Sequence, residues 1–144
     1  MSEFRIGRTD SRYLSLRILG RAYHDRDDWE ANWLIAEVEI GAGGFRGRFG
    51  ANFLAGEVSS LRHDLSRLYA FDSREAAFNA YDGQLAIQFK GDGLGNFTAE
   101  CDALDEGSSR LIFSLSFDQT EIPAILKGLD AVLKEYPLTG KDDI

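Results

Sequence analysis

Cysteine, histidine and proline are scarce in this sequence, and their scarcity excludes several kinds of protein. Among 144 residues there are one cysteine, two histidines and two prolines. Cys101 has no second cysteine with which to form an internal disulfide or a thiolate metal cluster, which agrees with a reducing compartment. His24 and His63 have no neighbour at metal-ligand spacing, so we expect neither to bind a metal or act in catalysis. Walker loops and nucleophile elbows are also absent, and the sequence predicts no enzyme and no cofactor.

Long hydrophobic runs and basic residues are scarce as well. No window approaches the roughly 18 apolar residues of a membrane span, and the first residues lack the apolar segment of a secretory signal, so we expect a cytoplasmic protein without membrane contact. Sixteen Lys and Arg against 24 Asp and Glu give a net charge of −8. This charge repels nucleic acid and attracts basic proteins, which predicts no direct binding of nucleic acid. The same charge is also typical of proteins in which it serves only solubility.

Apolar and polar residues alternate along much of the chain, with the period of two that indicates half-buried strands. The alternation predicts strands at about residues 12–19, 34–40, 45–53, 85–89, 97–101 and 111–117, and a short one at 78–80. Apolar residues at helical spacing predict two helices, at about 56–69 and 121–136. The order strands, helix, strands, helix lacks the strict alternation of a parallel sheet.

The predicted fold is therefore α+β. We expect a curved antiparallel sheet of about eight strands with two helices packed on one face. The length fits a single domain over residues 1–144, with a polar tail at about 141–144. Cys101 alternates in phase with Phe97 and Ala99, so we expect its thiol in the core.

The two halves of the chain repeat each other at a fixed offset. Phe53 maps onto Phe117, 64 positions later, and the same shift maps Glu57 onto Glu121. In each copy a strand that ends in Phe runs through a short cap into an amphipathic helix. The sequence thus predicts an internal pseudo-repeat, with Thr120 as the N-cap of the second helix.

Two glycine-rich segments lie between predicted strands, at 41–44 and 91–96. Each predicts a hairpin turn, because neither leads into a helix N-terminus that would hold a phosphate. Pairing across the first turn places Glu39 beside Arg46 on the polar face of the sheet, where opposite charges support the pairing.

The segment 25–30 combines an indole with four carboxylates: Asp25, Asp27, Asp28, Trp29 and Glu30. It lacks the glycine that an EF-hand loop needs at its sixth position. Three interpretations remain, namely a solvated loop, an ion site and an acidic edge that binds a partner. We take these five residues as the candidate partner-binding site, with Trp29 as its anchor, because aromatic residues dominate interface hot spots. A hydrolase that uses these carboxylates with a metal is the enzymatic alternative.

Two stretches in this order give the chain a family resemblance. Residues 27–34 carry two tryptophans into a predicted strand, and residues 117–120 precede the second helix, which ends at Tyr136, Pro137 and Gly140. Over residues 14–140 the chain resembles bacterial proteins of the WapI-type immunity family and related small uncharacterised families.

The resemblance implies a non-enzymatic protein of the bacterial cytosol that binds and neutralises a cognate toxin domain. WapI-type toxins are similar to tRNA-cleaving nucleases, whose active surfaces are basic, so an acidic inhibitor would place carboxylates where substrate phosphates bind. The resemblance carries no catalytic residue. The alternative function is a structural or assembly module that acts through an open polar sheet face or pairs into a homodimer.

Overall fold

The computed structural model describes residues 2–23, 25–26 and 28–139. The first sheet has the strand order β1 (Ser2–Ile6), β2 (Arg12–Arg21), β3 (Trp33–Ala42) and β4 (Phe45–Leu54). Helix α1 (Ala55–Tyr69) follows. The second sheet has the order β5 (Glu75–Asn79), β6 (Leu85–Gly91), β7 (Asn96–Leu104) and β8 (Arg110–Asp118), and helix α2 (Ile122–Glu135) ends the fold. The 3-10 turns η1 (Trp29–Asn32) and η2 (Gln119–Glu121) precede β3 and α2.

The predicted α+β class, the antiparallel strands and the order strands, helix, strands, helix are confirmed. The eight strands are divided equally between two sheets. Strand β1 has no counterpart among the predicted segments, because it places only Phe4 and Ile6 in the core. The predicted tail at 141–144 lies outside the described residues. No helix in the described ranges is long and apolar enough to cross a membrane.

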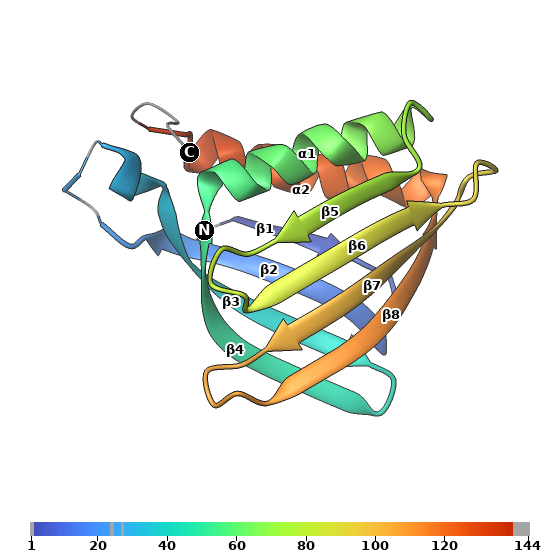
Figure 1. The fold of residues 1–144 in the computed structure, drawn as a ribbon, viewed down its shortest axis with the longest axis horizontal. Helices are drawn as coiled ribbons and strands as arrows, with labels where there is room; N and C mark the ends of the chain where they lie inside the picture. Colours follow the sequence, from blue (N-terminus) through green and yellow to red (C-terminus); the bar gives the residue numbers. More distant parts are fainter. Residues whose placement is uncertain (1, 24, 27, 140–144) are drawn as a thin grey trace.

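Both sheets turn their apolar faces toward one core, and α1 and α2 lie side by side against it (Figure 1). Helix α2 packs on β1 and helix α1 packs on β5. The rings of Phe53 on β4 and Phe78 on β5 meet edge to face at 5.3 Å and join the two sheets. Full burial of one such side chain contributes about 1.5–3 kcal/mol. Each helix buries one apolar face, as its helical spacing predicts. The buried residues are Val58, Leu61, Leu65 and Leu68 in α1 and Ile122, Ile125, Leu129 and Val132 in α2.

The 64-residue repeat is visible in the way both helices begin. A carboxylate oxygen of Glu57 accepts the N–H of Leu54 at 2.7 Å, and Glu121 accepts the N–H of Asp118 at 3.2 Å. Both the glutamates and the amides are related by the same offset, so each copy of the strand-to-helix turn is closed by the same carboxylate bond.

The predicted N-cap role of Thr120 is wrong. The amide of Thr120 donates to Oδ1 of Asp118 at 2.9 Å, and its hydroxyl also bonds that carboxylate. Asp118 is therefore the cap, because the chain makes the η2 turn before α2 starts and a carboxylate is the stronger acceptor.

The register predicted across the first glycine turn is also wrong. The loop consists of Gly43 and Gly44 alone, Ala42 pairs with Phe45, and Gly43 has φ of 67°, which glycine adopts without strain. Glu39 consequently faces Arg48, whose Nη2 donates to Oε1 of Glu39 at 3.0 Å.

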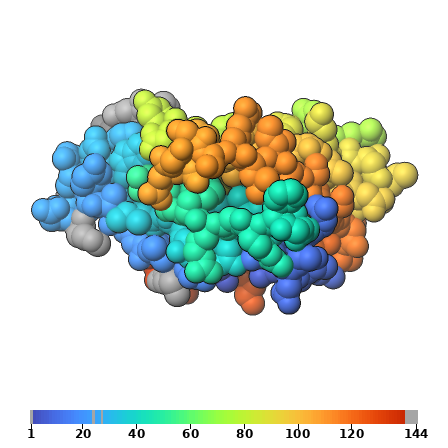
Figure 2. Space-filling model, turned by 90° about the horizontal axis from the view of Figure 1, so that it is seen from below, coloured from blue at the N-terminus to red at the C-terminus, as the bar shows by residue number. Residues whose placement is uncertain are grey.

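Side chains from the second half of the chain cover the free edge of β4. The amide of Gly50 donates to Oε1 of Glu106 at 2.9 Å, and the amide of Asn52 donates to Oε1 of Gln84 at 3.0 Å. Figure 2 shows β4 beside residues of the β7–β8 region on this face, opposite the helices. Covered edge amides are unavailable for pairing with another chain, and the same bonds tie the two sheets together.

Substitution of Gly128 tests the close packing of α2 on β1. A Cβ at Gly128 would lie 2.8 Å from Cβ of Phe4 and 2.9 Å from the carbonyl oxygen of Glu3. We expect Gly128→Ala to lower the free energy of unfolding by about 1–2 kcal/mol, despite the better helix propensity of alanine. The matched control is Gly56→Ala in α1, where nothing lies within 4 Å of the new methyl group. Urea denaturation should show Gly56→Ala neutral or stabilising, and a stable Gly128→Ala would contradict the packing described.

The two capping glutamates provide a second pair of variants. Glu57 accepts two amides, those of Leu54 and Tyr81, whereas Glu121 accepts one, that of Asp118. We expect Glu57→Ala to destabilise the fold by about 2 kcal/mol and Glu121→Ala by about 1 kcal/mol, since each unpaired amide adds to the cost. Glu121 also forms an ion pair with Arg8 at 3.4 Å, so equal losses in thermal or urea unfolding would show that the second amide bond of Glu57 contributes no more than that exposed ion pair.

Candidate functional site

The acidic segment connects β2 to β3 and protrudes at one end of the molecule (Figures 1 and 2). Asp25 and Asp28 are exposed, and Trp29 and Glu30 are half-buried. Asp27, the fifth residue of the predicted site, lies outside the described residues, as does His24. The side chains that the structure places here therefore combine carboxylates with an indole at a surface.

The end of this segment is fastened to the stretch that follows α2. Asn32, which is 3% exposed, donates through Nδ2 to the carbonyl of Thr139 at 3.0 Å and accepts the amide of Thr139 at 2.8 Å. The hydroxyl of Thr139 donates to the carbonyl of Asp28 at 3.0 Å. The guanidinium of Arg21 donates to the carbonyls of Ala31 and Pro137 at 2.6 and 2.7 Å. These bonds give η1 a fixed position, which a freely solvated loop would lack.

One carboxylate of the segment is neutralised locally. Nε of Arg26 donates to Oδ1 of Asp28 at 3.0 Å, and Nη2 bonds the other oxygen. This hydrogen bonding holds the pKa of Asp28 below its ordinary value. Within the described ranges neither Asp25 nor Glu30 has an ion-pair partner, so these two carboxylates are available to a partner.

Three aromatic side chains form a continuous row beside the acidic segment. The rings of Trp29 and Trp33 lie 6.4 Å apart, and those of Trp33 and Tyr81 lie 6.0 Å apart. Tyr81 is 74% exposed and belongs to the turn between β5 and β6. We call Trp29, Trp33 and Tyr81 the aromatic row; it extends the site from the first half of the chain to the second.

The sequence prediction included Trp29 and missed Trp33 and Tyr81. Strand β3 alternates, with Leu34 and Ala36 in the core, so its first residue Trp33 faces outward. A tryptophan at an outward position was the available signal for Trp33. Tyr81 gave no such signal, because its proximity to Trp33 arises only when the two sheets pack together.

Glu57 fixes the backbone that carries Tyr81. Its Oε2 accepts the amide of Tyr81 at 2.6 Å, while Oε1 accepts the amide of Leu54 at the start of α1. Burial raises the pKa of Glu57 above its ordinary value, although these two amides act in the opposite direction. The outer end of the aromatic row thus depends on the same carboxylate that starts the helix.

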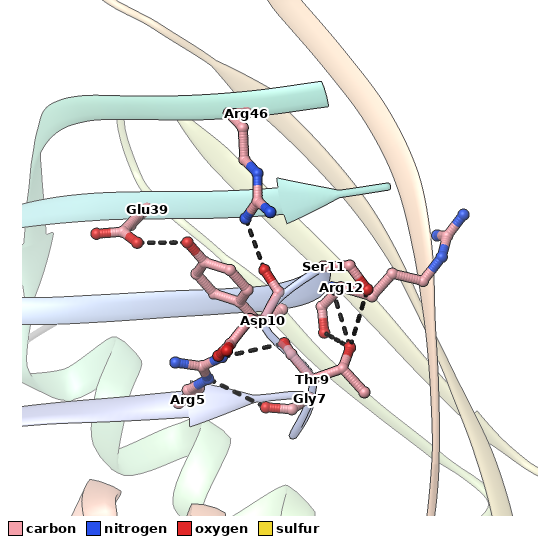
Figure 3. A network of polar contacts seen from close by, with 9 residues as sticks. Arg5, Gly7, Thr9, Asp10, Ser11, Arg12, Glu39 and Arg46 are labelled. Carbon is pink, nitrogen blue, oxygen red and sulfur yellow. Dashed lines mark hydrogen bonds and ion pairs between the residues drawn. The ribbon is translucent and has the colours of Figure 1, made fainter. Parts of the chain in front are cut away.

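The polar face of the first sheet carries charges that are paired with one another (Figure 3). The hydroxyl of Tyr13 donates to Glu39, and this bond raises the pKa of Tyr13 and lowers that of Glu39. The guanidinium of Arg5 lies 4.1 Å from the centre of the Tyr13 ring, and Arg46 donates to the carbonyl of Asp10 at 2.7 Å. These contacts give the charged side chains on this face a structural role, so their presence does not require a bound partner.

Metal-dependent chemistry finds no support in the described part of the chain. There, no group of three His, Cys, Asp or Glu side chains could hold a metal ion. A cavity of about 600 Å³ at the ends of β6–β8 includes Asp92 and Asp118. Asp92 accepts the amides of Leu94 and Asn96 within its turn, as predicted for 91–96, and Asp118 is the cap described above. Both carboxylates therefore have structural roles.

Comparisons with known proteins connect this chain to one family and one fold. A model of the Immunity protein WapI-like family matches residues 5–137. No curated protein matches the chain. Among solved structures it is similar to a guideRNA-binding protein complex bound to a gRNA, with a TM-score of 0.52 and 14% identity over 92% of this chain and 89% of that one. It is also similar to trypanosoma bruciei MRP1/MRP2, with a TM-score of 0.50 and 14% identity over 92% and 84% of the two chains. At such low identity these structures indicate a shared fold alone.

The single thiol gives a direct test of the core in the second sheet, where Cys101 lies between Ile87 and Phe113. Cys101 is buried, and burial raises its pKa to about 12. Since the thiolate is the reactive form, we expect no reaction of the folded protein with a thiol reagent such as Ellman's reagent at pH 8, and one reactive thiol per chain after unfolding. A rapid absorbance change with folded protein would contradict the position of β7 in the core.

Proposed function

This chain belongs to the WapI-like immunity protein family, and on that basis we propose that it binds a cognate toxin domain and neutralises it without catalysing a reaction. Inhibition by binding requires a surface that a partner can cover, and it needs no catalytic group. The proposal concerns a toxin produced by the same cell type, against which a cytoplasmic inhibitor protects the producer.

The observation that carries the proposal is the contact of three rings beside two available carboxylates. The ring of Trp33 contacts that of Trp29 on one side and that of Tyr81 on the other. Tyr81 is the most exposed of the described tyrosines. Large aromatic side chains at a fixed position are the groups that most often dominate binding energy. The bonds of Asn32 and Thr139 hold the surface in place before a partner arrives, which reduces the entropy lost on binding.

Charge favours a basic toxin surface as the target. The net charge of −8 accelerates encounter with a basic protein, and Asp25 and Glu30 can replace the phosphates that a nuclease holds in its active site. We therefore propose a nuclease domain as the partner. The fold shared with a guideRNA-binding complex does not extend RNA binding to this chain, because the same net charge repels the phosphate backbone.

Co-expression with the toxic domain encoded beside this chain tests the function. We expect growth to be rescued, and the two proteins to purify as a stable complex. Failure of both, with a toxic domain present, would refute the immunity function and would direct attention to an assembly module.

A triple variant tests the location of the interface. We expect Asp25→Asn, Trp29→Ala and Glu30→Gln together to weaken the complex at least tenfold, with slower association, because an anchor and two steering charges are lost. The matched control is Asp72→Asn, Glu75→Gln and Leu94→Ala, which removes the same charge and an exposed apolar side chain. These residues belong to the α1–β5 turn, the start of β5 and the β6–β7 turn, segments that lie at the opposite end of the molecule from the acidic segment (Figure 1). Kinetic binding measurements that show equal losses for both triples would exclude the acidic segment as the contact.

A further inference from the structure

The aromatic row has a geometry that suits one kind of side chain. Trp29 and Trp33 meet at an interplanar angle of 81°, and Trp33 and Tyr81 at 78°. Rings that meet nearly at right angles form a corner in which two aromatic surfaces face one small volume. The face of an aromatic ring is electrically negative, so such a corner attracts a cation within about 6 Å of a ring centre.

Elsewhere the chain supplies its own cations to aromatic rings. Arg5 lies over Tyr13 at 4.1 Å, with Arg46 on the same ring at 5.9 Å, and Arg21 lies 5.9 Å from the centre of Tyr136. In the described ranges no arginine or lysine lies over Trp29, Trp33 or Tyr81. Arg26, the cation nearest in sequence to Trp29, is occupied by the carboxylate of Asp28. The aromatic row, which contains both tryptophans of the chain, is thus left without an internal cation.

Carboxylates at both ends of the row add to its attraction for a positive charge. Glu30 follows Trp29 directly, and Asp82 follows Tyr81 directly and is exposed. Neither forms an ion pair with a described residue. The residues that follow the two end rings of the row thus both carry a negative charge, which adds to the attraction of the rings for a cation.

We infer that the aromatic row receives an arginine side chain from the basic surface of the toxin, an inference that rests on the function proposed above. Arginine fits better than lysine because its guanidinium is planar, stacks on aromatic faces and still presents donors to Glu30 or Asp82. Tyr81 is the exposed end of this arginine-binding site, so the interface includes both halves of the chain. Glu57 is a positioning residue, since it holds the backbone of Tyr81 without reaching the partner.

Substitutions at Tyr81 separate the aromatic face from the rest of the side chain. We expect Tyr81→Leu to raise the Kd for the toxin domain about tenfold, because it keeps apolar area and removes the ring. Tyr81→Phe keeps the ring and should stay within about twofold of the wild type. Ile112→Ala, at a position 64% exposed on β8, is the control and should leave the Kd unchanged. Tyr81→Leu with wild-type affinity, or equal losses for Tyr81→Leu and Tyr81→Phe, would overturn the inference.

A second measurement does not require the toxin. Both tryptophans of the chain lie in the row, so their two indole N–H signals in an NMR spectrum report on this surface alone. We expect tetra-arginine amide to shift these signals, tetraglutamine to leave them unchanged, and Tyr81→Leu to reduce the shift. If the toxin fails to bind while tetra-arginine still shifts both signals, the proposed function is refuted and the arginine site remains. No shift with tetra-arginine would overturn the inference, and an equal shift with tetralysine would overturn the choice of arginine over lysine.

Discussion

The carboxylate of Glu57 connects the fold of this protein to its candidate binding surface. It accepts the amide of Leu54, which starts α1, and the amide of Tyr81, which belongs to the turn between β5 and β6. These two amides come from opposite halves of the chain, and desolvation of the carboxylate is the cost of joining them. The first half of the chain therefore positions an aromatic side chain of the second half beside Trp33. The corresponding Glu121 closes its own turn and forms an ion pair with Arg8 of the β1–β2 loop at 3.4 Å, so both copies join the two halves of the chain and the first one also carries Tyr81.

Local pattern was sufficient to predict most of the elements. Alternation located β2–β4 and β6–β8, and helical spacing located both helices, because each of these segments buries one side of itself. The division into two sheets could not be predicted, since inward and outward positions alternate in the same way whether strands share one sheet or two. Strand β1 was too short to show a period, and the Glu39 pairing failed because the glycine turn is two residues long.

The candidate site was predictable only in part, and the reason is physical. Asp25, Trp29 and Glu30 are neighbours in sequence, so composition alone made the segment visible. Tyr81 lies far along the chain and reaches Trp33 only through the packing of the two sheets. The capping bond of Asp118 was misassigned to Thr120 because a 3-10 turn before a helix cannot be distinguished by residue type from the helix itself. Contacts that depend on tertiary packing were thus the ones that the sequence did not reveal.

The most direct test of the binding surface is the hydrogen-exchange footprint of the cognate toxin domain on this protein. Amide exchange would be compared with and without the toxin for the whole chain. Binding at the aromatic row predicts added protection at residues 28–34 and 80–82, which come from separate halves of the chain and meet only in the folded structure. Protection confined to the polar face of the first sheet, around Tyr13 and Glu39, would contradict it.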